Sequence, residues 1–213
     1  MGSIMLVKRR LLSLFFPRNL RCAICGEELL GQEEAVCGEC GQGFHWEIRS
    51  RAVEGMTGVY AASNYDEALR KAILGFKYSN RRYLAYFFAL VLRDLPRQEG
   101  GILIPVPMHP LRRKKRGFCQ TTEICQDLSR LTDLKLETKA LRRIRNTPSQ
   151  TGLDARSRRE NLRGAFAADG QKITGRHCIL VDDVVTTDST LRECANTLRA
   201  VGAASVTGWA IAT

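Results

Sequence analysis

The stretch CILVDDVVTTDSTLREC, residues 178–194, connects an apolar strand pattern to a helical pattern through a polar turn. Cys178–Val181 is apolar and ends on a β-branched residue, as expected of a buried parallel strand. Apolar residues then recur at helical spacing, at Leu191, Cys194, Leu198 and Val201. A strand that leads through a short turn into a helix is the repeating unit of an α/β fold, so this stretch predicts a parallel sheet covered by helices.

The polar turn carries residues suited to binding a sugar phosphate. The helix that follows directs free backbone N–H groups and the positive end of its dipole to one point, which attracts phosphate. Asp182 and Asp183 are acceptors for sugar hydroxyls or ligands for Mg²⁺, and hydroxyl donors follow at Thr186, Thr187, Ser189 and Thr190. The alternative is a plain strand-to-helix loop in which Thr190 and Glu193 form a capping box. That alternative leaves the paired aspartates unexplained.

The rest of the chain after residue 57 alternates between the two patterns. Strands are predicted at Val59–Asn64, Ile102–Val106, Leu141–Ile144 and Ser205–Ala212, and helices at Asp66–Tyr78, Tyr83–Leu95 and Thr121–Leu131. Gly202 fits the C′ position of the helix that follows the polar turn. The predicted fold is therefore α/β, a mostly parallel sheet with helices on both faces and ligands at the carboxyl ends of the strands.

Four cysteines near the N-terminus are spaced for a metal. Cys22, Cys25, Cys37 and Cys40 form two CxxCG knuckles with 11 residues between the second and third cysteine. Each knuckle directs two thiolates at one tetrahedral ion, which predicts a zinc ribbon with a structural zinc and no open position for water. Disulfides are the alternative. Five glutamates and no Lys or Arg lie between Cys22 and Cys40, which argues against DNA contact by this module.

The predicted organisation has three parts. Residues 1–17 are expected to hold a tag remnant before Met5 and a short amphipathic helix at Leu6–Phe16, residues 18–50 the zinc ribbon, and residues 51–213 the α/β domain. No apolar stretch reaches the roughly 18 residues of a membrane span. The metal-like spacing of half of the eight cysteines fits a reducing compartment, so a cytoplasmic location is expected.

The net charge of +11 is concentrated in one window. Residues 102–163 hold 15 Lys and Arg against 6 Asp and Glu, a net charge of +9. Such a surface attracts a polyanion or a heavily phosphorylated ligand, although any single arginine in it is better explained by a solvated basic face.

The motifs together resemble a known family. Val181–Thr190 resembles the phosphoribosyl pyrophosphate (PRPP) loop of type I phosphoribosyltransferases, and nearly the whole chain resembles the ComF family. The further matching blocks, in the family's order, are the double CxxC, Phe76–Tyr78, Ile104–Pro107 with His109-Pro110, Arg116–Gln120, Thr147–Gln150, and Arg159–Asn161 with Gly164–Phe166.

The resemblance implies a role for each matching position. Asp182 and Asp183 would hold the ribose hydroxyls of PRPP, directly or through Mg²⁺, and Thr186, Thr187, Asp188, Ser189 and Thr190 would surround the 5′-phosphate. The turn at Pro105 and Val106 would bind the pyrophosphate. Lys77, Arg116 and Asp183 are the catalytic candidates, because the departing pyrophosphate gathers negative charge that Lys77 and Arg116 would neutralise.

Two positions depart from the family pattern. Asp188 stands where the family usually has glycine, and Cys119 stands where it usually has asparagine. A carboxylate beside a phosphate repels it by about 1 kcal/mol or more, depending on exposure. The alternative is that Asp188 points away from the phosphate and caps the helix.

The resemblance implies two classes of function. The first is transfer of a phosphoribosyl group to an unknown acceptor, with a role in DNA uptake during natural transformation beside a helicase-like competence partner. The second is a non-catalytic module that binds single-stranded DNA or senses PRPP. The basic residues Arg112, Arg113, Lys114 and Lys115 are the nucleic-acid-binding candidates, because a phosphate backbone is bound largely through charge.

Overall fold

The computed structural model describes residues 22, 24–29, 36–78, 82–97, 100–147 and 155–213. The amphipathic helix expected at Leu6–Phe16 lies outside the described residues, as does Pro148–Gln150 of one matching block.

In the described part of the chain, six strands form one sheet in the order β1-β2-β8-β7-β3-β4. The strands are β1 (Arg49–Arg51), β2 (Gly58–Ser63), β3 (Ile102–Pro105), β4 (Lys135–Leu136), β7 (His177–Val184) and β8 (Ser205–Ala212). Only the pair β1 and β2 is antiparallel among these neighbours. The sheet is thus mostly parallel, which confirms the expected fold class, and β8 has the bounds that the sequence predicts.

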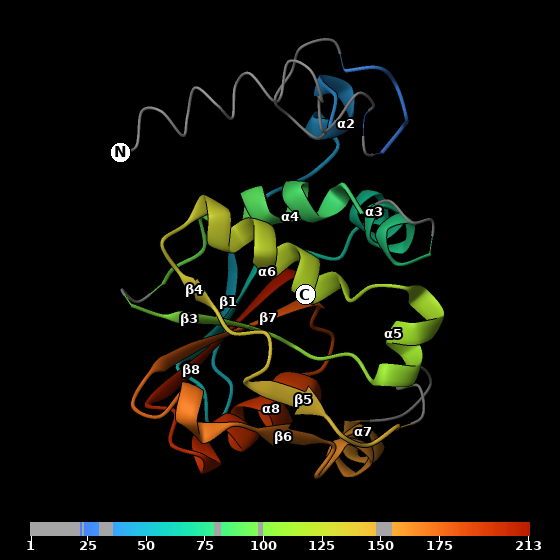
Figure 1. Cartoon of the computed structure of the whole chain (residues 1–213). Helices are drawn as coiled ribbons and strands as arrows, with labels where there is room; N and C mark the ends of the chain where they lie inside the picture. The colour runs from blue at the N-terminus through green and yellow to red at the C-terminus, as the bar shows by residue number, and fades with distance from the viewer. Residues whose placement is uncertain (1–21, 23, 30–35, 79–81, 98–99, 148–154) are drawn as a thin grey trace.

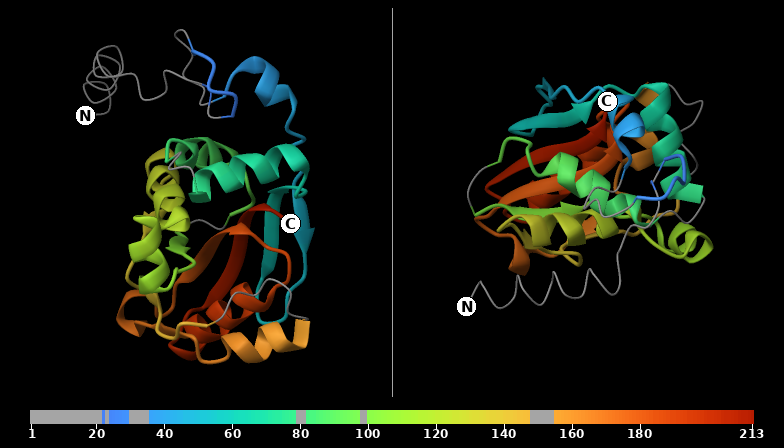
Figure 2. Two further views of the ribbon diagram at one scale, coloured as in Figure 1. Left: turned by 90° about the vertical axis from the view of Figure 1, so that its right-hand side faces the viewer. Right: turned by 90° about the horizontal axis from the view of Figure 1, so that it is seen from above.

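Helices cover both faces of the sheet (Figure 1). α3 (Glu67–Tyr78), α4 (Leu84–Leu92) and α6 (Gln120–Leu131) pack on one face. α8 (Ser189–Ala200) packs on the other face, next to α7 (Ala155–Leu162) and a hairpin of β5 (Leu141–Arg143) and β6 (Phe166–Ala168). Figure 2 shows the same two layers from the side and from above.

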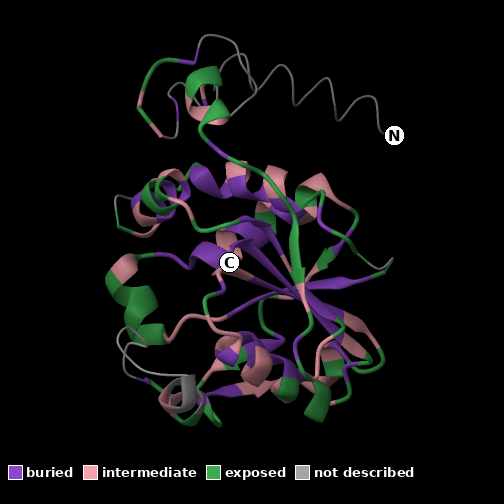
Figure 3. Ribbon diagram, turned by 180° about the vertical axis from the view of Figure 1, so that it is seen from behind, coloured by how far each residue is buried: buried purple, intermediate pink, exposed green. Residues whose placement is uncertain are grey.

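The apolar residues of the central strands divide between these two layers. Along β7, Ile179 and Val181 belong to the core beneath α3, α4 and α6, whereas Cys178 and Leu180 belong to the core beneath α8. The alternation arises because successive side chains of a strand point to opposite faces. Cys178–Val181 of β7 is therefore apolar and buried on both faces, which gives a continuous apolar run in the sequence, and Figure 3 shows the central strands as largely buried.

Several elements were not predicted. They include α5 (Pro110–Arg116), α7, β1, β4, β6, the short helix α2 (Gly38–Gln42) and a turn of 3₁₀ helix at Gly170–Lys172. α5 has local start and stop signals: its first residue is Pro110, His109 Nδ1 accepts the N–H of Leu111, and Gly117 ends it with φ of 86°.

The described residues between Cys22 and Trp46, called the cysteine segment below, pack against α4. Phe44 lies 5.5 Å from Phe87 and Trp46 lies 5.8 Å from Phe87, measured between ring centroids. Cys22 and Val36 belong to the same apolar core as α4. Among the described residues, no helix is both long and apolar enough to cross a bilayer.

Candidate functional site

The alternation of side chains along β7 places the two aspartates on opposite sides of the sheet. Asp182 continues the row of Cys178 and Leu180 toward α8 and the β5–β6 hairpin, and Asp183 continues the row of Ile179 and Val181 toward α3. The Asp182 carboxylate accepts the backbone N–H of Asp183 at 2.9 Å, and the Asp183 carboxylate accepts the backbone N–H of Val184 at 2.8 Å. These hydrogen bonds hold both carboxylates at the carboxyl end of the strand.

Lys77 neutralises Asp183. It lies in the last turn of α3, and its Nζ is 2.8 Å from Asp183 Oδ2. The side chains are 22% and 15% exposed, so water screens the pair only partly. Burial would lower the pKa of Lys77, but the charges of Asp183 and then Asp182 raise it above its usual value. Lys77 is therefore a fixed positive charge at this end of the sheet.

Asp182 has no such ion pair with a described residue. The pKa of Asp182 is raised to about 7, mainly because the carboxyl group is buried and secondly because of the negative charge of the adjacent Asp183. The carboxyl group of Asp182 consequently changes its protonation state near neutral pH, which suits a group whose charge is completed by a cation or a ligand.

Asp188 is paired with Arg51. The two side chains approach to 2.7 Å between Arg51 Nη2 and Asp188 Oδ1, and both are partly buried. Asp188 occupies the N-cap position of α8 but makes no capping hydrogen bond with its side chain, so the alternative in which this side chain caps the helix is wrong. Its carboxylate is neutralised by Arg51 instead.

Arg51 also contacts the residues that directly follow β7 and β8. Its Nη1 donates to Thr213 Oγ1 at 2.6 Å and its Nη2 to the carbonyl oxygen of Val185 at 3.2 Å. The sequence analysis missed Arg51, because it lies on the short polar strand β1 and meets Asp188 only through the fold. The one signal in the sequence was Asp188, a carboxylate next to the expected phosphate position, which would require a cation nearby.

The remaining residues of the loop after β7 differ in their exposure to solvent. Thr186 is exposed, Thr187 and Thr190 are half-buried, and Ser189 is buried at the start of α8. The capping box suggested for Thr190 and Glu193 is not formed, because the N-cap is Asp188 and Glu193 accepts the N–H of Gly164 at 2.7 Å.

The turn after β3 lies beside the end of β7. The N–H of Val106 donates to the carbonyl oxygen of Val181 at 2.9 Å, and Thr121 Oγ1 donates to the carbonyl oxygen of Val106 at 2.8 Å. These contacts place the turn from Pro105 next to the strand that carries both aspartates.

Arg116 is the last residue of α5, and it lies near the end of α3. Its Nη1 donates to Gln120 Oε1 at 2.7 Å, and its guanidinium lies 5.2 Å from the ring centroid of Tyr78, the neighbour of Lys77. Cys119 is buried, with its sulfur 3.2 Å from Thr121 Oγ1. Cys119 therefore belongs to the packing of α6, whereas Arg116 is close to the Lys77 end of the site.

α5 presents the basic residues. Arg112, Arg113, Lys114 and Lys115 are all exposed on this short helix. Arg112 differs from the others because its Nη2 donates to the carbonyl oxygen of Thr147 at 3.0 Å. The four nucleic-acid-binding candidates thus share one helix, separate from the cysteine segment in Figure 1.

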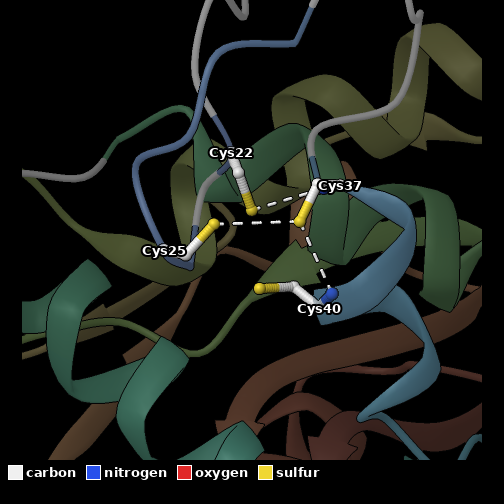
Figure 4. A group of neighbouring side chains, drawn as sticks. All are labelled: Cys22, Cys25, Cys37 and Cys40. Carbon is white, nitrogen blue, oxygen red and sulfur yellow. Dashed lines mark hydrogen bonds between the residues drawn. The ribbon is translucent and has the colours of Figure 1, made fainter.

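The four cysteines converge as a metal site requires (Figure 4). Their sulfur atoms all lie within 4.8 Å of one another, and all four cysteines are free, so the disulfide alternative is wrong. Burial opposes ionisation of Cys22, but the backbone amides of Cys37, Cys25 and Ile24 stabilise its thiolate and lower its pKa to about 6. Four sulfur ligands at this spacing could hold a zinc ion.

No family model matches the chain. It is 30% identical to competence protein F of Haemophilus influenzae over 215 residues, which cover 94% of this chain and 93% of that protein. The chain belongs to the ComF family. It is also 37% identical to the DNA utilization protein YhgH of Escherichia coli K12, over 70% of this chain and 69% of that protein.

Among solved structures, this ComF-family chain shows weaker similarities. One is an allosteric regulatory enzyme of purine biosynthesis, with a TM-score of 0.41 and 16% identity over 62% of this chain and 26% of that one. Another is the Leishmania donovani hypoxanthine-guanine phosphoribosyltransferase, with a TM-score of 0.35 and 15% identity over 62% of this chain and 70% of that one.

Proposed function

We propose that the chain binds PRPP with Mg²⁺ at the carboxyl end of β7 and transfers its phosphoribosyl group to an acceptor. The observation that carries this proposal is the placement of Asp182 and Asp183 at the end of a central strand, with Lys77 against one of them and the loop to α8 directly after. Carboxylates serve ribose hydroxyls and Mg²⁺, and the loop and helix start serve a phosphate.

The pairing of Asp188 with Arg51 supports the same proposal. An unpaired carboxylate would repel a 5′-phosphate, whereas a neutralised one leaves the loop able to accept it. The turn from Pro105, adjacent to β7, would receive the pyrophosphate, and Lys77 and Arg116 would oppose the charge that develops on it.

Two further roles follow from the family. The cysteine cluster would hold a structural zinc that stabilises the segment packed on α4. The names competence protein F and DNA utilization protein, which two relatives carry, support a role for this chain in DNA uptake.

The test of sugar-phosphate binding is calorimetric titration of PRPP with Mg²⁺ into the zinc-loaded protein. Micromolar binding is expected in the wild type and a loss of at least tenfold in Asp182→Asn and in Asp183→Asn. Asp133→Asn is the matched control, because Asp133 is exposed and follows α6. A folded wild type that binds no PRPP, or aspartate variants that bind as the control does, would overturn the proposal.

A second candidate function is binding of single-stranded DNA, and the exposed basic helix α5 favours it. Affinity would then fall steeply with salt, because phosphate contacts release counterions. Replacing Arg113 and Lys114 by Gln should flatten that slope, whereas the same change at the exposed pair Arg70 and Lys71 on α3 should not. The absence of binding at low salt would exclude this function.

A further inference from the structure

Arg143 is an unusual arginine, since it is half-buried beside the candidate site. It comes from β5, and its guanidinium lies 5.5 Å from the ring centroid of Phe166 on β6. Its Nη2 donates to Thr147 Oγ1. Its Nε is buried and has no hydrogen-bond partner in the described part of the chain, which is costly for a charged donor.

A second arginine meets Arg143 at the same residue. Arg112 reaches from α5 to the carbonyl oxygen of Thr147 at 3.0 Å, while Arg143 contacts the hydroxyl of that threonine. Thr147 is 3% exposed, so it is a fixed point between the two guanidiniums. Burial, and after it the charge of Arg112, lowers the pKa of Arg143.

Neither guanidinium is neutralised by a described carboxylate. Across the described ranges, no Asp or Glu oxygen lies within the 4.0 Å of an ion pair from Arg112 or Arg143. Two like charges brought together around one buried threonine are unfavourable unless an anion joins them.

Arg112 and Thr147 line a cavity that can admit such an anion, and Arg143 lies behind its wall, in contact with Thr147. The cavity has a volume of about 420 Å³ and is lined by Leu111, Arg112, Lys115, Asn146 and Thr147. Lys115 adds a second positive charge to its wall beside Arg112, and none of the described residues that line it is acidic. Because an arginine fork donates two parallel hydrogen bonds, this wall suits a phosphate group.

The cavity lies on the side of the sheet to which Asp182 points. β5 belongs to the hairpin that packs on this face, and the charges of Asp182 and Arg143 interact, the arginine lowering the pKa of the aspartate. The cluster is therefore a neighbour of the proposed sugar-phosphate site and yet is built from different elements, α5 and the hairpin.

We propose that Arg112 and Arg143, with Thr147 and Lys115, form a second phosphate subsite next to the loop after β7. This inference deepens the proposed function and rests on it for the identity of the neighbouring ligand. The group bound is a phosphate, supplied either by the diphosphate of the sugar phosphate or by a phosphate that the acceptor carries.

The test is calorimetric titration of inorganic phosphate, at low salt, into protein saturated with ribose 5-phosphate. Phosphate is expected to bind the wild type and to bind Arg112→Gln and Arg143→Gln at least tenfold more weakly. Arg70→Gln is the matched control, because it removes the same charge from an exposed side chain of α3, a helix that packs on the other face of the sheet; its affinity should stay within twofold of wild type.

Two further arms make the result decisive. With PRPP in place of ribose 5-phosphate, lost phosphate binding identifies the diphosphate as the occupant, and retained binding identifies the acceptor's phosphate.

Thermal melts establish that each variant is folded, and Arg112→Gln, on the exposed helix, decides the matter if Arg143→Gln does not fold. Phosphate that binds both variants as tightly as the wild type, or that fails to bind the wild type, overturns the subsite. Failure of ribose 5-phosphate to bind would instead contradict the proposed function, and phosphate would then be titrated alone.

Discussion

Arg51 Nη2 lies 2.7 Å from Asp188 Oδ1, so a strand that follows the cysteine segment neutralises the acidic residue of the loop after β7. The same guanidinium donates to the carbonyl oxygen of Val185 and to Thr213 Oγ1. Asp188 in the loop and Arg51 on β1 thus form a pair with no net charge.

Removal of this counter-charge is expected to weaken ribose 5-phosphate binding. In Arg51→Gln the carboxylate of Asp188 stays near the phosphate without a partner, and a repulsion of about 1 kcal/mol or more corresponds to roughly a five- to tenfold loss of affinity. Calorimetric titration of ribose 5-phosphate measures it.

The double variant Arg51→Gln/Asp188→Asn should recover most of that affinity, because the unpaired charge is then absent. Arg49→Gln is the control, since Arg49 lies on the same strand and pairs only with the exposed Glu47 among its described partners. Equal losses in the single and the double variant would show that charge at Asp188 does not govern binding.

The pair of Lys77 and Asp183 should contribute to stability in an asymmetric way. Lys77→Met leaves two adjacent carboxylates without their cation, whereas Asp183→Asn leaves Lys77 with Asp182. Breaking a buried pair costs on the order of 3 kcal/mol. We expect urea denaturation at pH 7 to give a larger loss for Lys77→Met than for Asp183→Asn.

The control for that comparison is Lys71→Met. The contact of Lys71 with Glu67 is exposed and 3.8 Å long, so its loss should change the free energy of unfolding by less than about 1 kcal/mol. A smaller loss in Lys77→Met than in Asp183→Asn would contradict the view that the charge of Lys77 offsets both carboxylates.

The elements that the sequence predicted share a strong apolar pattern. β8 has the predicted bounds, and α8 buries Leu191, Cys194 and Leu198 on one face, with Gly202 after it at φ of 98°. These elements could be predicted because burial on a helix face or a strand is a local property of residue order. The CxxCG knuckles were predictable for the same reason, since the ligands lie close in sequence.

The missed elements lack that pattern. α5 reads PLRRKKR, α7 reads ARSRRENL and β1 reads RSR, so none has an apolar stripe, and each owes its structure to capping or to its neighbours. The contacts of Arg51 with Asp188 and of Arg143 with Thr147 and Phe166 join residues whose partnership depends on the three-dimensional fold. No local spacing rule can predict such pairs.

Removal of zinc is expected to unfold the cysteine segment but not the sheet. Metal analysis should find one zinc per chain, and Cys37→Ser or a strong chelator should abolish it, because four thiolates complete the coordination. Trp46 reports the change by fluorescence, since its ring stacks 5.3 Å from Phe44, whereas Trp209 is fully buried in the sheet.

Cys178→Ala is the matched control for zinc content, because Cys178 lies on β7 and is no part of the cluster. Wild-type protein purified without chelator that contains no zinc would contradict the assignment, as would a Cys37→Ser variant that keeps its full zinc content.

The raised pKa of Asp182 should make stability depend on pH. Burial, and then Asp183, raises this pKa to about 7 in the folded protein, against about 3.9 in an unfolded chain. Between these values the folded state holds a proton that the unfolded state has released, so the contribution of Asp182 to stability is fully present below about pH 4 and is lost as pH rises through 7.

Asp182→Asn removes that loss and can still accept the N–H of Asp183 through its amide oxygen. Denaturation at a series of pH values should show the variant equal to wild type near pH 4 and more stable by up to about 4 kcal/mol at pH 8, because the two pKa values differ by about three units and each unit corresponds to about 1.4 kcal/mol. Asp133→Asn should show no such trend, and a difference for Asp182→Asn that does not change with pH would mean that this carboxyl ionises as an ordinary aspartate does.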